Sequence, residues 1–225
     1  MSKRLLRKGF FMEKLLCPSM MCADFSNLGK EVVNLEAADI DIFHVDIMDG
    51  NYVPNFGMGL QDLESIRKST TKPVDVHLMI MNPSRYVERF IDLGANIIYI
   101  HPEVDLNPVT TLETIRNLGA KPGIAISPGV SLESISELFP YCEYVMIMTV
   151  NPGFAGQKFL ESMNDKIEKL IEIQKNFEFE ILVDGAISKE KIDSLSDKGV
   201  NGFVLGTSAL FGKNENYKEI IESIR

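Results

Sequence analysis

The sequence has few cysteines and no paired cysteine motif. Only Cys17, Cys22 and Cys142 occur among 225 residues, and none of them forms a CxxC pair. An odd, sparse set of thiols excludes a disulfide framework and favours a reducing compartment, in which cysteine acts as a small buried hydrophobe. No apolar run approaches the length of a membrane span. We therefore expect a cytoplasmic protein with no membrane partner.

The chain also lacks an excess of positive charge. Its 23 Lys and Arg residues are outnumbered by 32 Asp and Glu residues, which gives a formal net charge of -9. A phosphate backbone or an anionic membrane requires a basic face, so the composition argues against nucleic acid and membrane surfaces as main partners. A small anionic substrate is compatible with the composition, because a local pocket can be positive on an acidic protein.

Short apolar or β-branched runs alternate with helical patterns, and no linker rich in Pro, Gly or Ser divides them. The predicted helices cover residues 27–38, 82–95, 107–120, 131–139, 162–175, 188–200 and 214–225. The eight predicted strands are Leu15–Pro18, Ile42–Ile47, Val74–Leu78, Ile97–Ile100, Pro122–Ile126, Tyr144–Met148, Glu180–Val183 and Gly202–Leu205. This order predicts a single-domain α/β fold, a (β/α)8 TIM barrel. The competing doubly wound sheet usually carries GxGxxG after its first strand, and this chain has no such motif there.

The barrel is predicted to span residues 13–225. Residues 1–12 are interpreted as a short N-terminal extension, with Met12 as an alternative start. Three helical patterns end in a glycine just before the next strand, which is typical of a left-handed helix stop: Gly94, Gly119 and Gly199.

Polar side chains gather at the predicted strand ends, and these ends meet at one mouth of a barrel. All three histidines of the chain, His44, His77 and His101, lie there. His44 and Asp46 are one residue apart in a strand, so both point inward, where His77 and Asp184 can converge with them. Two imidazoles and two carboxylates predict a site for one divalent ion such as Zn²⁺, Fe²⁺, Mn²⁺ or Co²⁺. The alternative is a polar mouth with His–Asp hydrogen bonds and no metal.

Glycine-containing segments after the last three strands predict a phosphate site. Their backbone N–H groups can approach an anion closely, and phosphates commonly bind after strands 7 and 8 of this architecture. A short helix after Gly206 would offer its N-terminus to the anion. For each glycine alone, a tight turn is the alternative. The predicted phosphate-binding residues are Gly153, Phe154, Ala155, Gly156, Gly185, Ala186, Gly206, Thr207 and Ser208.

Three methionines, Met48, Met79 and Met148, lie at or beside strand ends next to the predicted metal ligands. One interpretation is core filling, for which the flexible methionine side chain is well suited. The other is that polarizable thioethers line the reacting face and exclude water without offering a competing base.

Taken with these motifs, the sequence resembles the ribulose-phosphate 3-epimerase family. The matching strings run from about Leu15 to Phe211 in family order: CPSMMCADF, FHVDIMDGNYVPN, VDVHLM, IIYIHPE, MTVNPGFAGQKF, ILVDG and GTSALF. The resemblance implies a TIM barrel that forms a dimer or a hexamer. It also implies one divalent metal held by His44, Asp46, His77 and Asp184, with Asp46 and Asp184 as the acid/base pair. The implied contacts to the sugar phosphate are Ser19, His77, Met48, Met79 and Met148.

One departure from the family bears on the substrate. Many members continue VDG with a second glycine, where this chain has Ala186; GFAGQ, Thr149 and GTSALF are more similar to the allulose-6-phosphate 3-epimerase branch. We therefore expect inversion at C3 of a D-ketulose phosphate through an enediolate, with D-allulose 6-phosphate slightly favoured over D-ribulose 5-phosphate. The alternatives are a metal-free phosphate-binding barrel, such as a decarboxylase or biosynthetic lyase, and a non-catalytic sugar-phosphate sensor.

Overall fold

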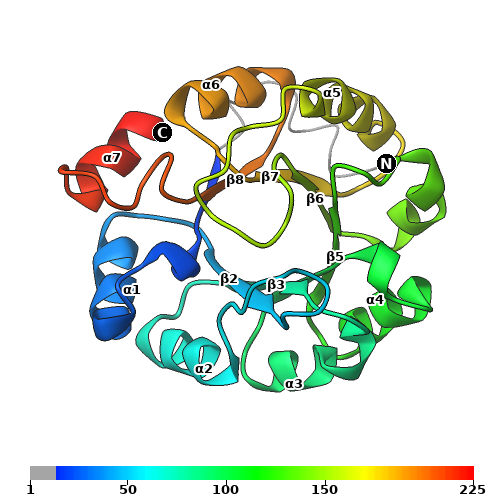
Figure 1. Ribbon diagram of the computed structural model, residues 1–225, viewed down its shortest axis with the longest axis horizontal. Coiled ribbons are helices and arrows are strands. Elements are labelled where there is room, and N and C mark those ends of the chain that lie inside the picture. Colours follow the sequence, from blue (N-terminus) through cyan, green and yellow to red (C-terminus); the bar gives the residue numbers. More distant parts are fainter. Residues whose placement is uncertain (1–13) are drawn as a thin grey trace.

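Eight parallel strands form a barrel inside a ring of helices in the computed structural model, which describes residues 14–225 (Figure 1). The strands are β1 (Leu15–Pro18), β2 (Phe43–Met48), β3 (Val74–Met79), β4 (Ile97–Ile100), β5 (Lys121–Ile126), β6 (Tyr144–Met148), β7 (Glu180–Asp184) and β8 (Gly202–Leu205). All eight strands were predicted, each with ends within one residue of those observed. The predicted extension over residues 1–12 lies outside the described residues.

The barrel is nearly closed. Hydrogen-bonded strands follow the order β1-β8-β7-β6-β5-β4-β3-β2, and all of these pairs are parallel. The seam between β1 and β2 is bridged at Ser19 and His44, and the backbone N–H of Asp41 donates to the Leu16 carbonyl at 3.0 Å. The predicted TIM barrel is therefore confirmed. The seam also places Ser19 beside the strand that carries His44 and Asp46.

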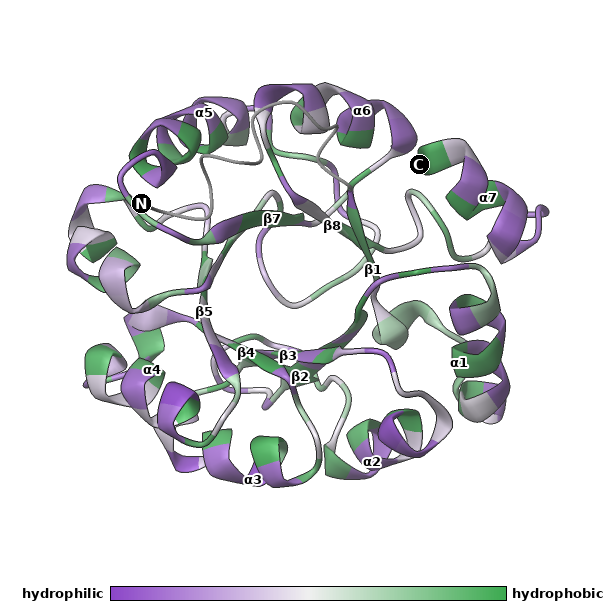
Figure 2. Ribbon diagram, turned by 180° about the vertical axis from the view of Figure 1, so that it is seen from behind, coloured by the Kyte–Doolittle hydropathy of each residue, from purple (hydrophilic) through white to green (hydrophobic). Residues whose placement is uncertain are grey.

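Amphipathic helices cover the outside of the barrel, with apolar residues toward the strands and polar residues toward solvent (Figure 2). They are α1 (Leu28–Ala37), α2 (Leu60–Ser69), α3 (Val87–Asp92), α4 (Pro108–Asn117), α5 (Met163–Gln174), α6 (Lys189–Lys198) and α7 (Tyr217–Ile224). The predicted helix stops at Gly94, Gly119 and Gly199 are confirmed, because all three have positive φ angles. Across residues 14–225 there is no helix with the length and apolar character needed to span a bilayer.

Three local predictions differ from the structure. α2 lies outside the predicted helical ranges. The segment predicted as a helix between β5 and β6 is a 3-10 helix over Glu133–Tyr141, which includes Pro140, and the proline nitrogen donates no hydrogen bond. The prediction of a helix after Gly206 is wrong. A single turn forms there, in which the Leu210 N–H donates to the Gly206 carbonyl at 2.9 Å.

Two apolar layers hold the polar mouth in place. The larger cluster lies between the strands and the helices and includes Val45, Ile47 and Val76. A smaller cluster fills the barrel interior with side chains that include Tyr99 and Met146. Burial of this much apolar surface is the main source of stability for such a fold. Because the inner cluster fills the barrel, the polar residues at the mouth lie against a packed interior instead of a pore.

Candidate active site

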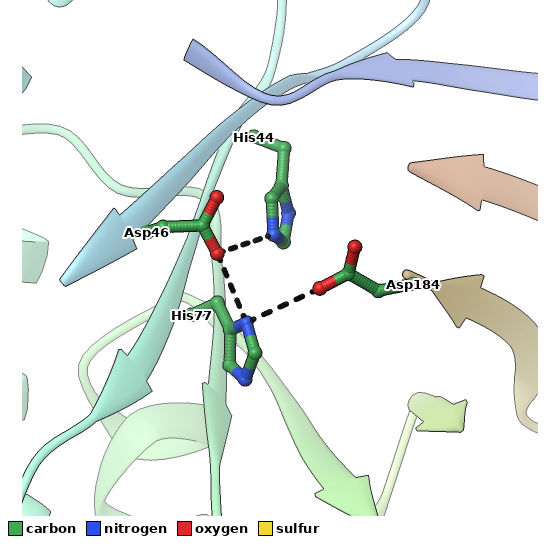
Figure 3. A group of neighbouring side chains, drawn as sticks. All are labelled: His44, Asp46, His77 and Asp184. Carbon is green, nitrogen blue, oxygen red and sulfur yellow. Dashed lines mark hydrogen bonds and ion pairs between the residues drawn. The ribbon is translucent and has the colours of Figure 1, made fainter. Parts of the chain in front are cut away.

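His44, Asp46, His77 and Asp184 converge inside the mouth of the barrel (Figure 3). Their potential ligand atoms all lie within 4.8 Å of one another. His44 Nε2 and His77 Nδ1 each lie 3.2 Å from Asp46 Oδ1, and His77 Nδ1 lies 3.8 Å from Asp184 Oδ2. The structure thus brings together the four residues that the sequence selects.

Strand pairing explains this convergence. In the parallel register of β2 and β3, His44 is opposite Asp75 and Asp46 is opposite His77. Because side chains alternate along a strand, these four residues face the barrel interior, whereas their neighbours face the helices. Asp184 is the last residue of β7, on the far side of the barrel (Figure 3).

The four side chains fit a divalent metal. Donor atoms about 2.0–2.1 Å from one ion lie roughly 3–4 Å from each other, which matches the three separations of 3.2, 3.2 and 3.8 Å given above. His44 Nδ1 lies 2.6 Å from Asp75 Oδ1, so the buried Asp75 orients the ring and leaves Nε2 for an ion. Asp75 was not selected from the sequence, although it is two residues before His77 on the same inward face.

The two aspartates have opposite tendencies to bind a proton. Burial disfavours the Asp46 anion, but His44 and His77 outweigh it and hold the pKa of Asp46 well below its usual value. Burial, with the nearby charge of Asp46, raises the pKa of Asp184 to about 7. Burial lowers the pKa of His77 to about 4, which keeps its ring neutral. The site therefore holds one carboxylate that is ionised and one that can carry a proton.

A cavity opens above this cluster. It is lined by Asp46 and Asp184, and by all nine of the predicted phosphate-binding residues. His44 and His77 are fully buried beneath it. Four of the five predicted substrate contacts also line it: Ser19, Met48, Met79 and Met148. Further lining residues that the sequence did not select are Met21, Cys22, Val150, Asn151, Gln157, Ile187 and Val204.

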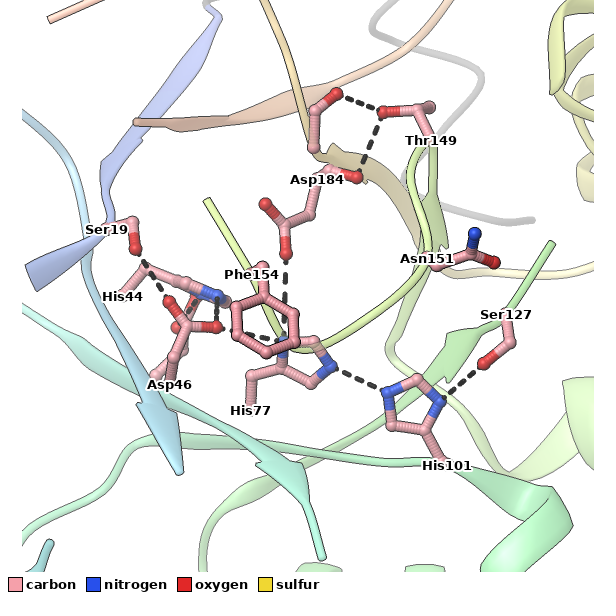
Figure 4. Close-up of polar contacts among 12 residues, drawn as sticks. Ser19, His44, Asp46, His77, His101, Ser127, Thr149, Asn151, Phe154 and Asp184 are labelled. Carbon is pink, nitrogen blue, oxygen red and sulfur yellow. Dashed lines mark hydrogen bonds and ion pairs between the residues drawn. The ribbon is translucent and has the colours of Figure 1, made fainter. Parts of the chain in front are cut away.

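The backbone after β7 is shaped closely against its neighbours. Gly185 has a φ of 113°, and a Cβ at this position would lie 2.5 Å from Val150 Cγ2, so only glycine fits. Thr149 Oγ1 donates to the Asp184 carbonyl at 3.0 Å and fixes the end of this strand (Figure 4). No lysine or arginine occurs among the described lining residues. An anion here would depend on backbone N–H groups and the hydroxyls of Thr207 and Ser208.

A family model described as the ribulose-phosphate 3 epimerase family matches residues 15–211. The ribulose-phosphate 3-epimerase of Helicobacter pylori is 41% identical over 212 residues, covering 93% of this chain and 96% of its own. That of Aquifex aeolicus is 39% identical over 204 residues, covering 90% and 91%. The chain belongs to the ribulose-phosphate 3-epimerase family. It is therefore an enzyme of the isomerase class.

A structural likeness supports the fold alone. A crystal structure of KGPDC from Streptococcus mutans has a TM-score of 0.73 to this epimerase. The match covers 94% of this chain and 95% of the other, at 12% sequence identity. At that identity the shared feature is the barrel, and a barrel hosts many unrelated activities.

A second polar cluster in this epimerase adjoins His77; the sequence placed His101 at this mouth but did not predict the cluster. It consists of Tyr52, His101, Glu103 and Ser127, which come from the segments after β2, β4 and β5. Burial acts to raise the pKa of Glu103, but His101 and Ser127 outweigh it and lower this pKa to about 2. Glu103 is therefore an ionised carboxylate that contacts His101, the neighbour of His77. Its position at a strand end, in the string HPE, was the available sequence signal.

Proposed function

We propose that this epimerase inverts C3 of a D-ketulose phosphate and interconverts D-ribulose 5-phosphate and D-xylulose 5-phosphate. The observation that carries the proposal is the pair of aspartates with opposite tendencies to bind a proton, which line a cavity together with Ser19, Thr207 and Ser208. The names of the relatives support the five-carbon substrate. The six-carbon D-allulose 6-phosphate is the alternative, because Ala186 stands where many family members have glycine.

One divalent ion would be held by His44, Asp46, His77 and Asp184. When bound, it would supply Lewis-acid stabilisation of the negative charge that develops on the substrate oxygens at C2 and C3. Asp75 would hold the His44 ring in the orientation that presents Nε2 to the site. Zn²⁺, Fe²⁺, Mn²⁺ and Co²⁺ all suit a mixed imidazole and carboxylate set.

The two aspartates would move the protons. Inversion requires removal of the C3 proton from one face and delivery of a proton to the other, because one base acting alone returns it to the same face. Asp46 is ionised, and its Oδ2 faces Ser19 Oγ at 2.6 Å, away from the imidazoles. Asp184 can hold the second proton on the opposite side of the mouth. In the reverse reaction these roles exchange.

The remaining lining residues would hold the substrate. Backbone N–H groups around Gly185 and Gly206 and the side chains of Thr207 and Ser208 would bind the phosphate. These phosphate contacts are remote from C3, so the binding energy they supply can orient the reacting carbon. Met48, Met79 and Met148 would exclude water from the enediolate without competing for its proton.

Turnover in deuterium oxide tests the proton transfers. We expect deuterium at C3 of the product, because the delivered proton comes from an acid that exchanges with solvent. Asp46→Asn and Asp184→Asn should each abolish epimerisation, and the metal content of each variant separates loss of the base from loss of the ion. Product that keeps the substrate's own C3 hydrogen would contradict the two-aspartate scheme.

The other open alternatives have distinct outcomes. A kcat/KM for D-allulose 6-phosphate that exceeds the value for D-ribulose 5-phosphate would overturn the five-carbon assignment. Full activity after exhaustive chelation would favour a metal-free phosphate-binding barrel. Binding of the sugar phosphate without isotope exchange at C3 would indicate a sensor. The dimer or hexamer suggested by the family resemblance stays a prediction, which sedimentation would test.

A further inference from the structure

His101 lies between the candidate metal ligand His77 and the polar cluster around Glu103. His77 Nε2 and His101 Nε2 are 2.8 Å apart, and both side chains are fully buried (Figure 4). On its other edge, His101 Nδ1 lies 3.1 Å from Tyr52 Oη and 3.1 Å from Ser127 Oγ. A hydrogen bond between two imidazole nitrogens requires one of them to carry the proton, so the direction of this contact sets the tautomer of both rings.

Glu103 determines that direction. Its Oε1 lies 2.7 Å from Tyr52 Oη and 2.5 Å from Ser127 Oγ, and an ionised carboxylate can only accept hydrogen bonds. The two hydroxyls are also 2.8 Å apart, so both can donate to Glu103, or one can donate to the other, which then donates to Glu103. Their oxygens then remain free to accept from His101 Nδ1–H, and Glu103 Oε1 itself also lies 3.4 Å from that nitrogen.

The consequence reaches the metal site. With its only ring proton on Nδ1, His101 presents a lone pair at Nε2, and His77 must donate from its own Nε2–H. His77 Nδ1 then carries a lone pair instead of the proton that the ionised Asp46 Oδ1, 3.2 Å away, would otherwise accept, and it also faces Asp184 Oδ2 at 3.8 Å. A lone pair among carboxylate oxygens favours a cation. The reverse direction would put a proton on His77 Nδ1 and block it as a ligand.

We propose that Glu103 is a positioning residue which, through the hydroxyls of Tyr52 and Ser127 and the ring of His101, fixes the His77 tautomer that can bind a metal. This inference rests on the metal site of the proposed function. His44 has a simpler arrangement, because Asp75 contacts its ring directly. The two imidazole ligands are thus oriented by two different carboxylates, one through direct contact and one through a relay.

The tautomers can be read directly, because the chain contains only three histidines. Long-range ¹H–¹⁵N correlation spectra of untagged, metal-free protein distinguish protonated Nδ1 from protonated Nε2. We expect Nδ1–H on His101 and Nε2–H on His77, and a mixture of tautomers on both rings in Glu103→Gln. Glu133→Gln, at an exposed position, should give the wild-type spectrum. A wild-type His101 protonated only on Nε2 would overturn the proposal, as would unchanged tautomers in Glu103→Gln.

Metal affinity gives a second readout that does not involve turnover. In a competition titration with a chromogenic chelator, Glu103→Gln should bind Zn²⁺ about 10–100-fold more weakly than wild type. The double variant Tyr52→Phe/Ser127→Ala removes both hydroxyl acceptors and leaves His101 Nδ1 only Glu103 Oε1, 3.4 Å away. It should show a loss in the same direction and replaces Glu103→Gln if that variant does not fold. Wild-type affinity in both would refute the relay. A wild-type protein that binds no Zn²⁺ would instead refute the metal site, while the tautomer measurement would still decide the relay.

Discussion

At the scale of single residues, Asp75 has a defined effect on the metal site. It is fully buried and contacts only one edge of the His44 ring, at 2.6 Å. In Asp75→Asn the neutral amide still accepts from Nδ1–H but makes the ring a weaker electron donor. We expect Zn²⁺ affinity to fall about 10–100-fold. Chelator competition measures this change, and Asp92→Asn, on the exposed face of α3, should leave the affinity unchanged. Equal affinities in the two variants would contradict this role.

Ala186 has a backbone conformation that an L-residue rarely adopts. Its φ is 52°, in the left-handed region, which costs roughly 1–2 kcal/mol for a residue with a Cβ. Ala186→Gly removes this cost but adds about 0.5–1 kcal/mol of chain entropy on folding. We expect a net gain in unfolding free energy of about 0.5–1 kcal/mol, measured by urea denaturation. Ala37→Gly, at the exposed last residue of α1, relieves no such strain and should instead lower it, by less than about 1 kcal/mol. A loss of stability in Ala186→Gly would mean that the alanine methyl group contributes contacts that outweigh the strain.

The residues that could be predicted from sequence are those fixed by strand periodicity. His44 and Asp46 are found from their spacing, and the same rule applied to Asp75 and His77 would have found Asp75 as well. Tyr52 is different, because it lies in a loop, and its contacts with segments 49 and 75 residues away depend on how three loops fold together. No local pattern predicts such contacts.

At the scale of elements, a lysine joins α5 to the segment that follows β5. Lys166 Nζ donates to the carbonyls of Pro128 and Val130 at 2.7 and 2.8 Å, and burial lowers its pKa. Lys166→Met leaves these acceptors unpaired, so we expect the unfolding free energy to fall by about 1–3 kcal/mol. Lys169→Met, at an exposed position on the same helix, should change it by less than about 0.5 kcal/mol. Chemical denaturation of the two variants compares them, and equal stabilities would show that the carbonyls find water instead.

Element types were predicted where the apolar pattern is strong, and they were wrong where the local geometry is set by packing. The strands are short but strongly apolar, so each was found. The segment after Gly206 has capping hydroxyls and apolar residues, yet it forms one turn before the chain continues to α7. Phosphate binding at this point therefore gains no helix dipole and depends on local N–H and hydroxyl groups.

At the scale of the whole molecule, the nearly closed barrel explains why distant residues form one site. Asp46 and Asp184 are far apart in sequence, but each lies near the carboxyl end of a parallel strand, and these ends share one rim. The contact between the loops over that rim depends instead on individual side chains. Asn55 Nδ2 donates to the Gly153 carbonyl at 2.7 Å and links the segment after β2 to the segment after β6. The fold determines the shared rim, whereas side-chain packing determines this link.

Metal removal should change the stability of the whole barrel in a pH-dependent way. Without an ion, the raised pKa of Asp184, about 7, means that the fold favours its protonated form. The stabilising protonation is complete below the unfolded value of 3.8 and is lost as pH rises toward 7. The Tm of chelated wild type should therefore fall, relative to that of chelated Asp184→Asn, as pH rises from 4 to 7, and the difference should level off above 7. Added Zn²⁺ should reverse the order at pH 8, because it stabilises only the protein that binds it. Thermal melts of both proteins with and without Zn²⁺ measure this crossover. If the Tm difference between chelated wild type and chelated Asp184→Asn stays constant from pH 4 to 7, the ionisation of Asp184 is not unfavourable in the metal-free barrel.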